Sequence, residues 1–181
     1  MTDGIGSSPG VQATPSHLTR GFLFVDLRGY TAFIEARGDA AAGRLLEAYR
    51  RVVREVVARS GGAEIKTEGD SFYVVFPSAS GAVGCGIAIV AAAASATAEH
   101  PDLPIHAAVG VHAGETAETE GGFVGSAVNV AARLCAAAAA GEVLVSDTVR
   151  GLTRTGGDIR YIARGRRRLK GITEPMAVYA A

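Results

Sequence analysis

The sequence predicts an α+β sandwich in which helices pack on a mainly antiparallel β-sheet. Strand-like and helix-like segments alternate along the chain, and several neighbouring strand-like segments are joined by short turns. With 181 residues, of which 48% are hydrophobic, the chain is long enough to bury one core. We expect that core in residues 18–181, and a flexible tail or linker remnant in residues 1–17, which are rich in Gly, Ser and Pro.

The first half of the chain predicts a buried strand, a helical region and a hairpin. Residues 21–26 form a short apolar run that is typical of a buried strand. Between residues 31 and 60 the apolar side chains recur at helical spacing, and Gly38-Asp39 divides this region into two helices. Two strands follow, at 63–67 and 71–76, and the turn Glu68-Gly69-Asp70 joins them as a hairpin.

The segment from residue 78 to residue 98 carries no charge and is long enough to cross a bilayer as a helix, at ~1.5 Å per residue. It consists mainly of Ala and Gly, and it lacks flanking Trp, Tyr or a basic cluster. We therefore expect a buried amphipathic helix, no membrane segment in this chain, and a cytoplasmic location.

The second half of the chain continues the alternation. Its expected elements, in order, are a strand at 105–112, a hairpin through 115–124, a helix at 126–139, a strand at 142–145, a short helix that opens at Ser146 or Asp147, and late strands near 159–163 and 176–179.

The charge balance and the cysteines exclude several classes of protein. The 18 basic residues are matched by 18 acidic ones, whereas a nucleic-acid coat needs a basic surplus to displace counterions. We therefore expect no nucleic-acid partner. Cys85 and Cys135 lie far apart and form no metal-ligand spacing, so we expect two buried thiols in a reducing compartment.

Two carboxylates stand at predicted strand boundaries. Asp26 directly follows a buried apolar run, and Asp70 lies in the hairpin turn. A rigid strand end fixes carboxylate oxygens, and two such groups could hold a pair of Mg²⁺ ions against a triphosphate. Taken alone, each residue is better explained as part of a turn or a helix cap.

The helix expected at 126–139 carries Asn129 and Arg133, which are four residues apart and therefore share one face. A guanidinium there suits negative charge that builds up on a phosphoryl group. The alternative is that Arg133 extends to water and Asn129 lies in the first turn beside a Ser126 cap. The basic run 164–170 is typical of a solvated hairpin, although Lys170 could point inward to phosphate.

Five segments, in order, resemble the catalytic domain of the class III adenylyl and guanylyl cyclases. The resemblance extends from about residue 21 to residue 179 and implies the ferredoxin-like form of the α+β sandwich. Its markers are Phe24-Val-Asp-Leu-Arg-Gly-Tyr-Thr31, Lys66-Thr-Glu-Gly-Asp-Ser-Phe72, Gly110-Val-His-Ala-Gly114, Val128-Asn-Val-Ala-Ala-Arg-Leu134 and Leu169-Lys-Gly171.

The resemblance implies a metal site and a base-reading residue. Asp26 and Asp70 match the two metal-binding aspartates, and the backbone carbonyl of Leu27 matches a further ligand, so two Mg²⁺ (or Mn²⁺) ions are implied. Lys66 matches the lysine that reads the adenine ring.

The resemblance also implies phosphate-binding residues and a symmetric homodimer. Asn129 matches the asparagine that orients the ribose, Arg133 the arginine that stabilises the transition-state phosphate, and Lys170 the lysine on the terminal phosphates. In this family the metal aspartates come from one catalytic domain and the Asn/Arg pair from another. Because this chain carries both sets, the resemblance implies a homodimer with composite active sites.

One position departs from the family pattern. The second base-reading residue, usually Asp or Thr in adenylyl cyclases, is replaced by Gly122. Lys66 is only a donor, so it could approach adenine N1 or guanine O6, and the acceptor for the exocyclic amine of adenine is missing. Glu120 would substitute if the hairpin shifts by two residues. We expect the change Gly122→Asp to increase the preference for ATP.

The function expected from these residues is a nucleotidyl cyclase, with ATP as the first candidate substrate and GTP as the second. A degenerate cyclase domain that binds nucleotide or a partner without turnover is the alternative, supported by Gly122 alone. An RNA-binding α+β domain is disfavoured by the zero net charge and by the small number of aromatic residues expected on the sheet.

Overall fold

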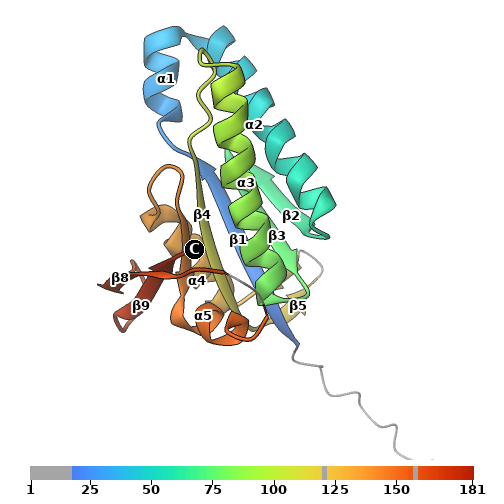
Figure 1. Ribbon diagram of the computed structural model, residues 1–181, viewed down its shortest axis with the longest axis vertical. Coiled ribbons are helices and arrows are strands. Elements are labelled where there is room, and N and C mark those ends of the chain that lie inside the picture. Colours follow the sequence, from blue (N-terminus) through green and yellow to red (C-terminus); the bar gives the residue numbers. More distant parts are fainter. Residues whose placement is uncertain (1–17, 120–121, 157–158) are drawn as a thin grey trace, which may run out of the picture.

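The computed structural model describes residues 18–119, 122–156 and 159–181. The expected tail at 1–17 and Glu120 lie outside the described residues. A seven-stranded sheet has the strand order β2-β3-β1-β4-β7-β9-β8, and a hairpin of two short strands lies beside it (Figure 1). The sheet strands are β1 (Thr19–Leu27), β2 (Ala63–Glu68), β3 (Ser71–Phe76), β4 (Ala107–Glu115), β7 (Val143–Ser146), β8 (Ile162–Arg167) and β9 (Met176–Ala180); the hairpin consists of β5 (Ala117–Thr119) and β6 (Gly122–Val124).

The expected α+β sandwich with a mainly antiparallel sheet is confirmed. Every neighbouring pair in the large sheet is antiparallel except β4 and β7, which are parallel. The helices α2 (Asp39–Arg59) and α3 (Ala79–Glu99) cover one face of the sheet, and α4 (Ser126–Ala137) covers the other. The short helices α1 (Tyr30–Arg37) and α5 (Asp147–Thr153) complete the described helices.

Most expected element boundaries are met, and the local chemistry explains them. Gly38, with a φ of 78°, separates α1 from α2, because this left-handed region favours glycine. The Ser146 side chain caps α5 by accepting a hydrogen bond from the backbone N–H of Val149 at 3.3 Å. The prediction of a late strand at 159–163 is wrong in position. β8 instead extends to Arg167 along the sheet edge, and its side chains are all exposed, so it lacks an apolar pattern.

Helix α3 is the one helix among the described residues that is long and apolar enough to cross a membrane, judged by length and composition alone. In the fold, one side of it packs on the sheet, where Ala82, Val83 and Ile89 are fully buried. Gly86 allows close approach, because a Cβ there would lie 3.0 Å from Val109. Both cysteines are free and buried, as expected.

Helix α4 approaches β4 very closely at Gly110. A Cβ atom at Gly110 would lie 2.0 Å from the backbone N of Cys135 and 2.5 Å from the carbonyl oxygen of Ala131. No side chain can occupy that space without moving the helix. Only glycine at position 110 therefore lets α4 lie at its observed height above the sheet.

We predict that Gly110→Ala lowers the free energy of unfolding by ~2 kcal/mol or more, because the new methyl group overpacks a contact between two backbones. Gly43→Ala is the matched control. Gly43 lies within α2 with no atom near its missing Cβ, so alanine there should stabilise the chain by ~0.5–1 kcal/mol. Urea denaturation of both variants measures the difference, and equal effects would contradict the proposed contact.

Candidate active site

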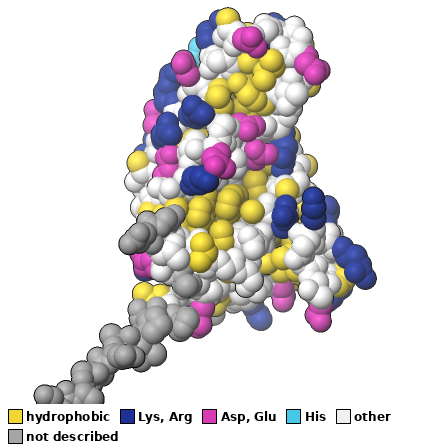
Figure 2. Space-filling model, turned by 180° about the vertical axis from the view of Figure 1, so that it is seen from behind, with side chains coloured by type: hydrophobic (Ala, Val, Ile, Leu, Met, Phe, Trp, Pro, Cys, Tyr) yellow, Lys and Arg dark blue, Asp and Glu magenta, His cyan; other side chains and the backbone are white. Residues whose placement is uncertain are grey.

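The chemistry-bearing side chains gather on the α4 face of the sheet, across β2, β3 and β1. Lys66 of β2 pairs with Tyr73 of β3, and Tyr73 pairs with Phe24 of β1. Two residues further along β2, Glu68 pairs with Ser71 of β3, and Ser71 lines the same pocket as Asp26 of β1. Alternate residues of a strand share a face, so this register places the side chains together. Figure 2, which views the molecule from behind, shows two groups of apolar side chains with acidic and basic side chains between them.

Two pockets adjoin on this face and share Phe24 and Ser71 as walls. The first, of 260 Å³, is also lined by Lys66, Glu68 and Tyr73. Its floor is aromatic, because the rings of Phe24 and Tyr73 stack in parallel with centroids 4.8 Å apart. The second, of 220 Å³, lies between Asp26 and the α4 residues Ala132, Cys135 and Ala136. We call them the base pocket and the carboxylate pocket.

The structure brings Asp26 and Asp70 together, as the sequence predicted. Burial raises the pKa of the Asp26 carboxyl above its ordinary value, the negative charge of Asp70 raises it further, and Arg28 opposes both effects. Burial likewise raises the pKa of the Cys135 thiol to about 12, so this neighbour is neutral at pH 7. Asp26 lines the carboxylate pocket and Asp70 follows in the adjoining turn, next to Ser71, and two carboxylates that repel each other in this way attract a cation.

Arg28 connects this site to α4, a role that the sequence did not indicate. Its Nη1 donates to Asp26 Oδ2 at 2.6 Å, and its Nε donates to the carbonyl oxygen of Ala138 at 3.2 Å. Its Nη2 donates to the carbonyl oxygen of Cys135. These carbonyls stand at the C-terminal end of α4, which attracts cations, and the Cys135 carbonyl also accepts from the backbone N–H of Ala138 at 3.0 Å. One guanidinium thus holds both Asp26 and the end of the helix.

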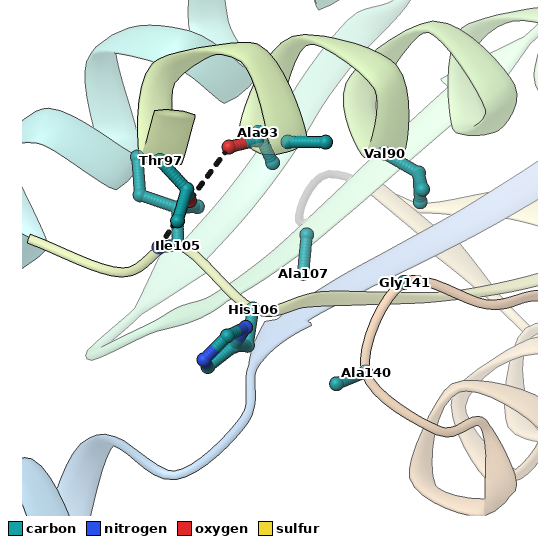
Figure 3. Close-up of a pocket in the computed structure, with 9 residues that line it drawn as sticks. Val90, Ala93, Thr97, Ile105, His106, Ala107, Ala140 and Gly141 are labelled. Atoms are coloured by element: carbon teal, nitrogen blue, oxygen red, sulfur yellow. Dashed lines mark hydrogen bonds between the residues drawn. The ribbon is translucent and has the colours of Figure 1, made fainter. Parts of the chain in front are cut away.

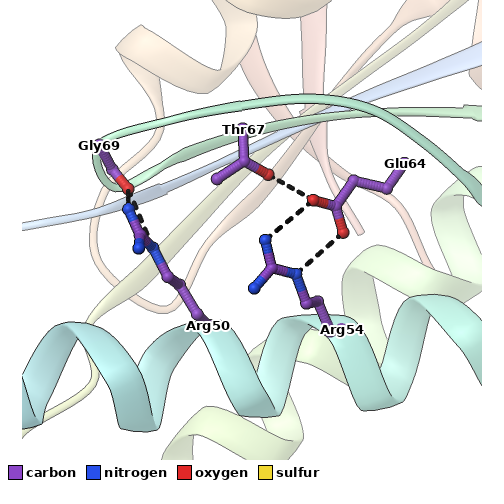
Figure 4. A network of polar contacts seen from close by, with 5 residues as sticks. All are labelled: Arg50, Arg54, Glu64, Thr67 and Gly69. Carbon is purple, nitrogen blue, oxygen red and sulfur yellow. Dashed lines mark hydrogen bonds and ion pairs between the residues drawn. The ribbon is translucent and has the colours of Figure 1, made fainter.

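A second network holds the turn that carries Asp70 (Figure 4). Arg50, on α2, donates through Nε to the carbonyl oxygen of Gly69 at 3.2 Å. Arg54 forms a two-point ion pair with Glu64, both contacts being 3.1 Å long, and the Thr67 hydroxyl donates to Glu64 at 2.6 Å. The β2–β3 hairpin is therefore tied to α2 immediately beside Asp70.

The carboxylate pocket fits a divalent ion that keeps an incomplete protein shell. Among residues 18–119, 122–156 and 159–181, no group of three or more His, Cys, Asp or Glu side chains converges on one point. An ion held by Asp26, Asp70 and the carbonyl of Leu27 would therefore complete its coordination with water and phosphate oxygens. Mg²⁺ usually binds in this way at phosphate-transfer sites.

The structure places Asn129 and Arg133 on the outer surface of α4, where both side chains are exposed. They share one stripe of the helix, as their spacing predicts, while Ala131 and Leu134 are fully buried on the opposite side. The helix begins after Gly125 without a side-chain cap, so Ser126 is not the cap, although Asn129 does lie in the first turn and Arg133 does extend to water in the single chain. Lys170 is also exposed, next to the buried Leu169.

Gly122 occupies a more restricted position than the sequence suggests. Its φ is +115°, and a Cβ atom there would lie 2.6 Å from Cγ2 of Ile65. Tyr73 fixes the same hairpin, because its hydroxyl donates to the carbonyl oxygen of Phe123 at 3.3 Å. An acidic residue at position 122 would therefore strain the backbone and displace Ile65. The expected gain in ATP preference from Gly122→Asp therefore requires Ile65 or the hairpin to move first.

A larger pocket, of 310 Å³, lies away from this face, between α3, the start of β4 and the loop before β7 (Figure 3). Its lining is mainly apolar, and the hydroxyl of Thr97 is used within the fold, donating to Ala93 at 2.8 Å and accepting from Ile105 at 2.9 Å. No carboxylate or basic side chain other than the imidazole of His106 lines it. The chemistry is therefore concentrated at the two smaller pockets.

Comparison with known proteins agrees with this arrangement of strands and helices. Residues 14–180 match the family described as "Adenylate and Guanylate cyclase catalytic domain". The chain belongs to this family.

Individual relatives support the same assignment. A "Putative adenylate cyclase 3" of Rhizobium meliloti is 31% identical over 158 residues, which are 87% of this chain and 27% of that protein. The chain thus spans well under half the length of this curated relative. The solved "Adenylate/Guanylate Cyclase/Hydrolase" of Silicibacter pomeroyi has a TM-score of 0.81 at 28% identity, covering 91% of this chain and 96% of that one. The adenylyl cyclase CyaB of P. aeruginosa has a TM-score of 0.77 at 25% identity, covering 91% and 94%.

We predict that Asp26→Asn stabilises the metal-free protein at pH 7 and abolishes its stabilisation by Mg²⁺. Because the pKa of Asp26 is raised in the folded state, the native protein loses stability as the pH rises through that pKa, and asparagine removes this loss. Mg²⁺ at ~100 times its Kd should stabilise the native protein by ~2.7 kcal/mol.

Thermal unfolding with EDTA or Mg²⁺, between pH 4 and pH 8, measures both effects. Asp102→Asn, at an exposed residue, is the control and should behave as the native chain does. If neither Mg²⁺ nor Mn²⁺ changed the melting temperature of the native protein, the assignment of Asp26 and Asp70 as metal ligands would be contradicted.

Proposed function

We propose that this chain is a nucleotidyl cyclase that converts ATP to 3′,5′-cyclic AMP and pyrophosphate. The observation that carries the proposal is the close pair Asp26 and Asp70 beside a pocket bounded by the helix that bears Asn129 and Arg133. Membership of the cyclase family and the similarity to adenylyl cyclases support it.

Each site residue has a proposed task. Asp26, Asp70 and the Leu27 carbonyl would hold two Mg²⁺ (or Mn²⁺) ions. When bound, such ions lower the pKa of the ribose 3′-hydroxyl and neutralise charge on the phosphates. Asn129 orients the ribose, so that the 3′-oxygen lies in line with the α-phosphorus, and this positioning supplies much of the rate enhancement.

The bond changes are those of a phosphoryl transfer. The 3′-oxygen forms a bond to the α-phosphorus, and the hydroxyl proton passes to water. The bond between the α-phosphorus and the oxygen that bridges it to the β-phosphate breaks, and pyrophosphate leaves. Arg133 stabilises the negative charge that gathers on the α-phosphoryl oxygens, and Lys170 stabilises the departing pyrophosphate. Both side chains are exposed in the single chain, as groups that enter a site on another subunit must be. We therefore propose a homodimer with two composite sites.

A cyclase with relaxed selectivity between ATP and GTP, or a domain that binds nucleotide without efficient turnover, is the second candidate. The specific observation in its favour is Gly122, where a positive φ and the neighbouring Ile65 side chain both disfavour the second base-reading side chain of the family. A product assay with ATP and with GTP, each with Mg²⁺ or Mn²⁺, separates these candidates.

We predict that Asp26→Ala and Arg133→Ala are each inactive alone and that an equal mixture recovers about a quarter of native activity. Random assortment makes half of the dimers mixed, and each mixed dimer has one site with both lesions and one site with none. Cyclic AMP formation after mixing and re-equilibration measures the recovery.

The matched control is a mixture of Asp26→Ala with Asp70→Ala. These two lesions belong to the same half of the site, so every site in every dimer carries one, and no activity should return. Recovery in neither mixture would contradict the composite site, and full turnover by Asp26→Ala alone would contradict the metal assignment.

A further inference from the structure

Glu68 shares the base pocket with Lys66. The two residues are two apart on β2, and Lys66 Nζ lies 2.6 Å from Glu68 Oε1. Together they line one side of the 260 Å³ pocket whose floor is the stacked pair of Phe24 and Tyr73. Position 68 therefore presents a carboxylate to the same space as the proposed base-reading lysine.

This ion pair is free to exchange partners. The two side chains are 62% and 72% exposed, and ion pairs that open to water contribute little to stability. Glu68 has no other hydrogen bond or ion pair among the described residues, whereas Glu64 on the same strand is engaged by Arg54 and Thr67. Glu64 therefore stabilises the hairpin, whereas the Glu68 carboxylate lines the base pocket and contacts only Lys66 among the described residues.

We propose that Glu68 is the acceptor that reads the exocyclic amine of adenine, beside Lys66 as the donor to adenine N1. The inference rests on the function proposed above and replaces the acceptor that Gly122 does not supply. Adenine presents an amine donor next to a ring-nitrogen acceptor on its Watson–Crick edge, and a carboxylate next to an ammonium group matches that order. The aromatic floor provides a surface on which the ring can stack.

The placement on β2 explains why the hairpin is not needed for base recognition. Glu68 lies directly opposite Ser71, on the side of the pocket that adjoins Asp26, whereas Gly122 packs against Ile65. A specificity residue on the β2–β3 hairpin is held in place by the contacts of Arg50 and Arg54 from α2. Side chains on well-supported strands position a ligand more accurately than side chains on loops.

The test compares ATP with purine riboside triphosphate, which lacks only the exocyclic amine. In the native protein we expect kcat/KM to favour ATP. In Glu68→Ala we expect kcat/KM for ATP to fall ~10-fold or more, while the value for purine riboside triphosphate changes less than ~2-fold. Glu68→Gln retains an acceptor oxygen and should keep part of the preference. Glu55→Ala, which removes an exposed carboxylate from α2, is the control and should leave both values unchanged.

Equal losses for the two substrates would overturn the inference, because they would mean that Glu68 acts only by placing Lys66. A native preference for GTP that Glu68→Ala removes would also overturn it, since the carboxylate would then be accepting from guanine.

Measurements of nucleotide binding test the role of Glu68 independently of whether the protein is a cyclase. The 3′-deoxy forms of the two triphosphates cannot cyclise, and calorimetry gives their Kd values for the native protein and for Glu68→Ala. A preference for the amine that depends on Glu68, in a protein that turns over no triphosphate, would support the inference and refute the proposed function. Equal Kd values for both ligands in the native protein, or no binding of either, would refute the inference whether or not turnover occurs.

Discussion

The backbone contact between α4 and β4 at Gly110 is the constraint on which the site depends. It sets the height of α4 above the sheet, because any side chain at position 110 would collide with the helix backbone. At this height the end of α4 lies within reach of Arg28, and the same guanidinium grips Asp26 at the end of β1. Arg28 and the Gly110 contact therefore fix the position of α4, with Asn129 and Arg133, relative to Asp26 on β1. If two chains form a composite site, the packing inside each chain sets the geometry of that site.

The carboxylate pocket shows how a fold can hold an unfavourable arrangement in place. Burial and the charge of Asp70 both work against ionised Asp26, and Arg28 offsets only part of that cost. The hairpin that carries Asp70 is held to α2 by Arg50, which donates to the Gly69 carbonyl, and by Arg54, which pairs with Glu64. Strain of this kind is stored where ligands bind, and a cation relieves it. Stability and metal affinity are thus opposed at Asp26.

Sequence alone anticipated much of the fold, because hydrophobic period and turn chemistry are local. The break at Gly38, the hairpin at Gly69 and the cap at Ser146 each follow from a few neighbouring residues. The same reasoning placed Asp26 and Asp70 at strand boundaries, and the structure brings them together. It misplaced β8, whose exposed edge position leaves no apolar pattern, and it missed the role of Arg28, which has partners 107 and 110 residues away. The restriction at Gly122 depends on a backbone angle and on Ile65, and the place of Glu68 depends on strand register, neither of which is visible in a linear sequence.

The arginine-rich edge strand β8 has a consequence for how copies of this chain meet. Its outer backbone groups are unpaired within the sheet, and such edges invite another strand to add on. Arg164 on this strand is paired with Glu142, whereas Arg166 and Arg167 form no ion pair among the described residues. A second copy that added its own β8 here would bring these positive charges close to their counterparts. Like-charge repulsion therefore disfavours pairing along this edge of the sheet.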